Sequence, residues 1–207
     1  MKTLIKNGLV VDPANLVQTH LNLLLEDGKI VAVTEEEPEA DRVIDAAGKV
    51  VAPGFIDIHM HEDPVKDDKI QFCIFDAMLR MGVTTAVGGN CGINVYDPVK
   101  YLDLLERDGA PVNVMMFAGH QYYREAAGAL DKYSPVTEEQ RKMMKKGLEE
   151  ALEAGCVGIS YGLRYVPGTG REEFLDTASC CQKEHRLISA HVRDDEERVF
   201  GAVAEVA

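Results

Sequence analysis

The stretch Val50–His61 reads Val-Val-Ala-Pro-Gly-Phe-Ile-Asp-Ile-His-Met-His. It is an apolar run that leaves a Pro-Gly corner and ends in two histidines, His59 and His61. Residues two apart on a strand point to the same face, so both imidazoles converge on one point, as two ligands of one metal ion must. The stretch therefore predicts a buried strand with a site at the carboxyl end of a parallel sheet or barrel.

Strands and helices are predicted to alternate along the chain from this stretch onward. We expect strands at 55–60, 83–87, 112–117, 157–160 and 187–191, and helices at 67–81, 98–107, 137–155, 172–185 and from 194 onward. This order implies a parallel sheet. The predicted fold class is α/β: residues 53–207 form a partial (β/α)8 TIM-type barrel with strands 1–5. Since only about 155 residues follow Ala52, a complete open sheet of five strands is the alternative.

The segment before the barrel, residues 1–52, is predicted to be a small β module, the amino-terminal half of a β-sandwich. Three turn signals interrupt its apolar runs, at Asn7-Gly8, Asp27-Gly28 and 46–48, and each predicts a hairpin. About fifty residues bury little surface. We therefore expect this module to need a partner against which it packs.

The composition limits the possible partners and the compartment. The net charge is −13, from 35 acidic and 22 basic residues, which argues against a nucleic-acid partner because phosphate binding needs a basic surface. No segment has the ~20 consecutive apolar residues needed to cross a membrane. The five cysteines are odd in number and scattered, which favours free thiols and a cytoplasmic location.

Four residues share one place in the predicted fold and form a candidate metal site. His59 and His61 follow the first strand, Cys91 follows the second, and His191 ends the fifth. The carboxyl ends of barrel strands surround a single mouth, and zinc accepts both imidazole and thiolate ligands. Taken singly, Cys91 is better explained by packing in the core, and His191 as an ordinary polar residue.

Candidate substrate-binding residues are expected at the same mouth. His120 ends the third strand, although a hydrogen bond within a loop explains it equally well. Tyr161 and Tyr165 belong to an irregular, glycine-rich segment after the fourth strand, and Arg193 follows the fifth. Loops at this end of a barrel carry substrate specificity.

Five stretches of the sequence together resemble the amidohydrolase superfamily, and within it the D-aminoacylase (N-acyl-D-amino-acid deacylase) branch. They are Pro53–His61, Gly82–Gly92 with its Asn-Cys-Gly end, Val112–Arg124, Gly158–Pro167 and Ser189–Asp194. The resemblance covers essentially the whole chain. Met60, Glu62 and Tyr161 depart from the small residue, the aspartate and the threonine that the family pattern leads us to expect.

The resemblance implies one or two zinc ions and a small-molecule substrate, most simply an N-acyl-D-amino acid. It implies that His59 and His61 bind one metal position, that Cys91 bridges, and that His191 binds the second. The family's catalytic aspartate is expected beyond Ala207, so we predict that residues 1–207 are a fragment with little or no activity. An unfinished barrel is also expected to self-associate or to require the missing carboxyl-terminal segment.

Two other functions are compatible with the sequence. The first is hydrolysis of a cyclic amide, as in dihydroorotase-like or hydantoinase-like relatives, although Cys91 in place of a lysine ligand argues against it. The second is a catalytically dead binding scaffold, which would have no reason to hold zinc in stoichiometric amount.

Overall fold

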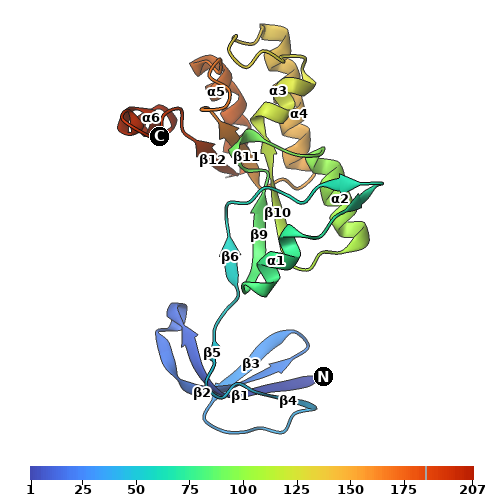
Figure 1. Ribbon diagram of the computed structural model, residues 1–207, viewed down its shortest axis with the longest axis vertical. Helices are drawn as coiled ribbons and strands as arrows, with labels where there is room; N and C mark the ends of the chain where they lie inside the picture. Colours follow the sequence, from blue (N-terminus) through green and yellow to red (C-terminus); the bar gives the residue numbers. More distant parts are fainter. Residues whose placement is uncertain (185) are drawn as a thin grey trace. The chain divides into compact units, whose positions relative to one another are not determined.

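The computed structural model describes residues 1–184 and 186–207. The chain divides into two compact units, Met1–Gly54 and Phe55–Ala207. Figure 1 shows that the first unit consists of strands and that strands alternate with helices in the second. None of the helices in the described residues has the length and hydropathy that crossing a lipid bilayer requires.

The first unit contains one five-stranded sheet. Its elements are β1 (Lys2–Asp12), η1 (Pro13–Asn15), β2 (Val17–Glu26), β3 (Lys29–Thr34), β4 (Arg42–Asp45) and β5 (Val50–Val51). The strand order is β3-β2-β1-β4, and β5 also pairs with β1. The hairpin predicted at Asp27-Gly28 is confirmed: β2 and β3 are antiparallel, and both turn residues have positive φ, 51° and 78°, as a tight hairpin turn requires.

The other two hairpins predicted for this unit are wrong. Asn7-Gly8 does not end a strand but forms a bulge within β1, where the register with β2 shifts. A side chain at Gly8 would lie 2.5 Å from Val51, so glycine is needed there for close approach. The segments around 46–48 do not pair with each other; β4 and β5 both run parallel to β1. Turn residues report a change of direction but not the strand with which the chain then pairs.

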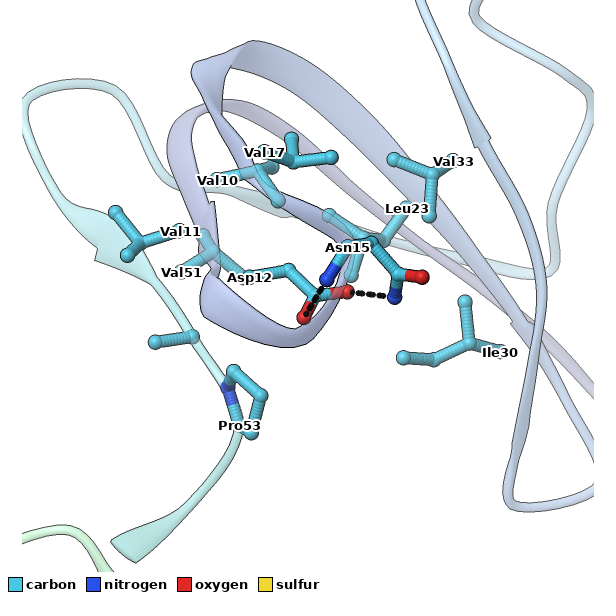
Figure 2. A pocket seen from close by; sticks show the side chains of 11 residues that line it. Val10, Val11, Asp12, Asn15, Val17, Leu23, Ile30, Val33, Val51 and Pro53 are labelled. Atoms are coloured by element: carbon cyan, nitrogen blue, oxygen red, sulfur yellow. Dashed lines mark hydrogen bonds between the residues drawn. The ribbon is translucent and has the colours of Figure 1, made fainter.

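An apolar hollow of about 320 Å³ lies in this unit. Figure 2 shows aliphatic side chains around it, and beside it the carboxylate of Asp12, which accepts hydrogen bonds from Asn15. The lining residues are Val10, Val11, Asp12, Asn15, Val17, Leu23, Ile30, Val33, Val51, Ala52 and Pro53. A β-sandwich needs a second sheet against such a surface, and that part of the expectation stays a prediction.

The second unit is built around five parallel strands in the order β12-β11-β10-β9-β6. The strands are β6 (Phe55–Asp57), β9 (Val83–Gly88), β10 (Asn113–Gly119), β11 (Gly158–Gly162) and β12 (Leu187–His191). The helical elements are α1 (Ile74–Arg80), η2 (Asn90–Gly92), α2 (Pro98–Asp108), α3 (His120–Ala126), α4 (Glu138–Glu153), α5 (Arg171–Ala178), η3 (Ser179–Glu184) and α6 (Val199–Val206). Figure 1 shows the strands side by side with helices along them, the arrangement of a partial TIM-type barrel.

Three predicted helices differ from those observed. The first half of 67–81 is a small hairpin, β7 (Val65–Lys66) and β8 (Lys69–Ile70), because Asp67 and Asp68 adopt left-handed conformations with φ of 52° and 57°. The helix predicted at 172–185 ends as an α-helix at Ala178 and continues as η3; its expected last residue, His185, lies outside the described residues. The helix expected from 194 begins at Val199.

Two helix starts that the sequence predicts are confirmed. The Asp97 carboxylate accepts a hydrogen bond from the backbone of Lys100 at the start of α2, and Thr137 and Gln140 form a reciprocal capping box on α4. Between sheet and helices lies a core with fully buried side chains, among them Phe75, Tyr101, Met116, Met144, Leu148 and Ile159.

Candidate metal centre

The four predicted ligands all lie at the carboxyl ends of the parallel strands. His59 and His61 follow β6, which ends at Asp57 rather than at Met60. The prediction that this strand is buried is wrong, because Phe55 and Ile56 are 65% and 66% exposed. Cys91 lies in η2, which begins two residues after β9, and His191 is the last residue of β12. Three strands, which carry residues as far apart in sequence as His59 and His191, therefore deliver side chains to one place.

The distances between donor atoms suit a metal ion. One ligand atom each from His59, His61 and Cys91 lie within 4.8 Å of one another. The Cys91 sulfur is 3.4 Å from Nε2 of His59 and 3.8 Å from Nδ1 of His191. A tetrahedral zinc ion keeps a nitrogen and a sulfur ligand roughly 3.5 Å apart. The donor set, imidazole nitrogen and sulfur, and its spacing therefore both fit zinc.

His191 is brought to the sulfur but does not belong to the close group of three. Cys91 thus lies close both to the pair His59 and His61 and to His191. A thiolate can bridge two metal positions, so the geometry is compatible with one ion or with two.

Cys91 itself is held in an unusual state. Its side chain is 4% exposed, and burial raises the pKa of its thiol. Its backbone has φ 59° and ψ 22°, a left-handed conformation that costs a non-glycine residue roughly 1–2 kcal/mol. A bound cation would stabilise the thiolate that burial disfavours.

The turn that carries Cys91, residues 89–92, is fixed by buried polar groups, and we call it the Cys91 turn. The hydroxyl of Ser160 on β11 accepts a hydrogen bond from the Gly92 amide at 3.0 Å and donates one to the Gly89 carbonyl. The Asn90 amide group donates to the carbonyls of Ile58 and Val87 at 3.2 and 2.9 Å. These bonds tie the turn to three strand ends.

His191 is oriented by two neighbours. The Tyr165 hydroxyl lies 3.1 Å from its Nδ1, and the Asp195 carboxylate lies 3.4 Å from its Nε2. A carboxylate beside Nε2 favours the tautomer that is protonated there, which leaves Nδ1 unprotonated towards the sulfur. Tyr165, predicted to bind substrate, is therefore part of the surroundings of the candidate metal centre.

The other three residues predicted to bind substrate are engaged in contacts within the protein. His120 is 1% exposed and Tyr161 is fully buried, with its hydroxyl bonded to Thr177. Arg193 is paired with Glu205 and donates to two backbone carbonyls. A substrate role for these residues stays a prediction, and for His120 and Tyr161 it would require the surrounding segment to open.

Sequence reasoning missed a buried ion cluster behind the mouth. Glu173 on α5 accepts hydrogen bonds from His120 at 2.9 Å and Arg124 at 3.0 Å. Burial opposes ionisation of Glu173, but these two partners outweigh it, so its pKa is lowered. No helix was predicted at 120–126, so the four-residue spacing that places His120 and Arg124 on one face of α3 could not be used.

Comparison with known proteins finds similarity along most of the chain. A family profile described as "Amidohydrolase family" matches residues 42–164. N-acyl-D-glutamate deacylase from Alcaligenes xylosoxydans xylosoxydans is 32% identical over 98% of this chain and 46% of its own length. Dihydroorotase from Elusimicrobium minutum is 43% identical over only 41% of this chain and 20% of its own length.

A solved structure extends this similarity to the fold. N-acyl-D-glutamate deacylase from Bordetella bronchiseptica, complexed with zinc and a phosphonate mimic of the tetrahedral intermediate, is 31% identical and superposes with a TM-score of 0.85. The match covers 99% of this chain and 48% of that one. The chain thus spans about half the length of the relatives it matches.

Proposed function

Because this chain belongs to the amidohydrolase family, we propose that it supplies the metal-binding part of a zinc-dependent hydrolase that deacylates N-acyl-D-amino acids. The observation that carries the proposal is the position of the Cys91 sulfur, 3.4 Å from a His59 nitrogen and 3.8 Å from a His191 nitrogen. The similarity to N-acyl-D-glutamate deacylases over nearly the whole chain supports the substrate class.

His59, His61, Cys91 and His191 would hold one or two zinc ions in this proposal. When bound, zinc supplies an activated water as nucleophile and polarises the amide carbonyl. The protein's contribution is to fix the ligands. The Asp57 carboxylate accepts a hydrogen bond from the His59 backbone amide at 3.0 Å, and the Asp195 carboxylate beside Nε2 of His191 would favour the tautomer that leaves Nδ1 free to bind zinc.

Substrate would approach from the exposed side of the ligand group, because His59 and His61 are exposed whereas Cys91 is buried. Tyr165 is 39% exposed, and its hydroxyl beside His191 can donate a hydrogen bond to a substrate oxygen. We propose Tyr165 as the substrate-binding residue with the best access, and His120, Tyr161 and Arg193 as residues that shape the mouth behind it.

Metal binding is the first test. We expect the purified chain to bind zinc in at least equimolar amount, measured by elemental analysis after dialysis, and Cys91→Ser to lower the amount bound. Cys156→Ser is the matched control, because Cys156 is also buried but is not one of the grouped donors. A chain that holds no zinc would instead be a binding scaffold without catalytic metal.

Substrate class is tested by the binding of intermediate mimics to the zinc-loaded chain. We expect a phosphonate analogue of N-acyl-D-glutamate to bind more tightly than its L enantiomer and than a cyclic dihydroorotate analogue, measured by calorimetry. Preference for the cyclic compound would favour the dihydroorotase-like alternative, to which the similarity extends over 41% of the chain. Equal binding of both enantiomers would remove the support for a D-amino acid substrate.

A further inference from the structure

The side chain that follows the second histidine of the site, Glu62, is buried and turned towards the Cys91 turn. It is 3% exposed, and its Oε2 accepts a hydrogen bond from the Gly89 amide at 3.0 Å. Its Oε1 accepts from Nδ2 of Asn94 at 3.0 Å and from the Val95 amide at 3.3 Å. One carboxylate therefore receives three N–H groups from the two sides of the Cys91 turn.

Asn94 connects Glu62 to β10. Its Nδ2 also donates to the Phe117 carbonyl at 3.1 Å, and its Oδ1 accepts from the Gly119 amide at 2.7 Å. The end of β10 is thereby fastened to the same carboxylate. Glu62 lies at the centre of a network that joins the segment after β6, the Cys91 turn and the end of β10.

We propose that Glu62 is a positioning residue for the metal centre, which holds the Cys91 thiolate in register with His59 and His61. This inference rests on the metal site proposed above. Glu62 adjoins His61 in sequence and binds both flanks of the turn that bears Cys91, so it connects two groups of ligands through one side chain. It need not touch the metal, and it acts through the backbone of the Cys91 turn.

The strain in the Cys91 turn explains why such a connection is needed. Cys91 has φ 59°, and a left-handed conformation at a non-glycine residue persists only where neighbouring interactions enforce it. Without the bond to Gly89, the turn would relax towards ordinary φ values, and the sulfur would move relative to the histidines.

The chemistry of the contacts distinguishes a carboxylate from an amide. All three partners of Glu62 are N–H donors, and a glutamine offers one acceptor oxygen and one NH₂ donor. In Glu62→Gln, the new NH₂ group therefore faces an N–H donor on one side of the turn, and the hydrogen bond there is lost. Outer-shell partners of this kind typically change metal affinity by about 10–100-fold when they are removed.

Asp63 provides a matched control, because it is the next residue, is fully buried and binds elsewhere. Its carboxylate accepts from the backbone amides of Cys73, Ile74 and Phe75 at the start of α1. Asp63→Asn thus removes the same charge at an adjacent position and destabilises a helix start rather than the Cys91 turn.

The experiment is a cobalt(II) titration of the wild-type chain, Glu62→Gln and Asp63→Asn, followed by the thiolate-to-cobalt charge-transfer absorption, with thermal melting as a check of folding. We expect the wild type and Asp63→Asn to show the band, and Glu62→Gln to require about 10–100-fold more cobalt or to lose the band. Should Glu62→Gln fail to fold, Glu62→Asp, which keeps the charge but withdraws it by one methylene, makes the same comparison.

The outcomes separate this inference from the function on which it rests. A wild-type chain without the thiolate band would overturn the metal site, and this inference with it. A wild-type band that Glu62→Gln or Glu62→Asp retains at unchanged affinity would overturn the role of Glu62 alone. Equal loss in Glu62→Gln and Asp63→Asn would also overturn it, because general destabilisation would then account for the effect.

Discussion

Gly162, the last residue of β11, offers the sharpest test of how the Cys91 turn is held. A methyl group at this position would overlap the carbonyl oxygen of Cys91 and would lie 3.0 Å from its carbonyl carbon. The obstacle is backbone, which cannot turn aside as a flexible side chain can. Gly162→Ala should therefore push the Cys91 turn away from the sheet.

The expected size of the effect follows from this overlap. Relief of the contact requires a backbone shift of roughly several tenths of an ångström, whereas metal ligands tolerate deviations of only about ±0.2 Å. The sulfur, now 3.4 Å from His59 and 3.8 Å from His191, would leave the range that a single ion spans. We expect about a tenfold or greater loss of zinc affinity, and a loss of about 1–3 kcal/mol in the free energy of unfolding from overpacking.

Zinc affinity by calorimetry and urea unfolding of the metal-free chain are the measurements. Gly128→Ala is the control, because Gly128 has a φ of 78° and nothing lies within 4 Å of an added methyl group. The free energy of unfolding of this variant should fall by about 1 kcal/mol from backbone strain alone, and its zinc affinity should not change. A Gly162→Ala variant that binds zinc as tightly as the Gly128→Ala variant would refute the reasoning.

Three further predictions concern pH, the core and the metal. Burial opposes ionisation of Glu173, but its partners lower its pKa. Its contribution to stability is therefore complete above pH about 4.3, the ordinary glutamate value, and is lost as the pH falls through the lower folded pKa. In Glu173→Gln, the melting temperature followed by circular dichroism should fall less steeply with decreasing pH in this range. Leu148→Ala, at a fully buried position of α4, should cost about 2–5 kcal/mol in urea unfolding, whereas Met143→Ala, at a side chain 57% exposed, should change stability by less than about 0.5 kcal/mol. Saturating zinc at about 100 times its dissociation constant should add about 2.7 kcal/mol of stability that a chelator removes, and a melting temperature unaffected by zinc would contradict binding to the folded chain.

The sequence predicts that the candidate ligands lie together, because their gathering depends on topology. Parallel strands deliver their carboxyl ends to one edge, so locating the strands was enough to bring together His59, Cys91 and His191, even though β6 ends at Asp57. The pairing of strands in the first unit could not be predicted in this way. The bulge at Asn7-Gly8 and the parallel course of β4 and β5 depend on which strand lies alongside, and local turn signals carry no information about that partner.

The supporting side chains could not be predicted for a different reason. Glu62 and Glu173 are charged residues that a sequence pattern assigns to the surface, since unpaired carboxylates are rarely buried. Each is 3% exposed because donors distant in sequence converge on it, three on Glu62 and two from α3 on Glu173. Likewise, nothing in Asn90-Cys91-Gly92 alone indicates a left-handed cysteine, since that conformation is imposed by hydrogen bonds from residues such as Ser160 on β11.

The bonds that enforce the strained Cys91 turn are all formed by protein groups. Glu62 and Ser160 hold it through hydrogen bonds with its backbone, so folding itself directs the Cys91 sulfur towards the histidines. The ordering cost is then met during folding rather than during metal binding, which favours tight binding through preorganisation. It follows that substitutions in the network around the Cys91 turn should change metal affinity more than they change the fold, whereas substitutions in the core beneath the sheet should do the reverse.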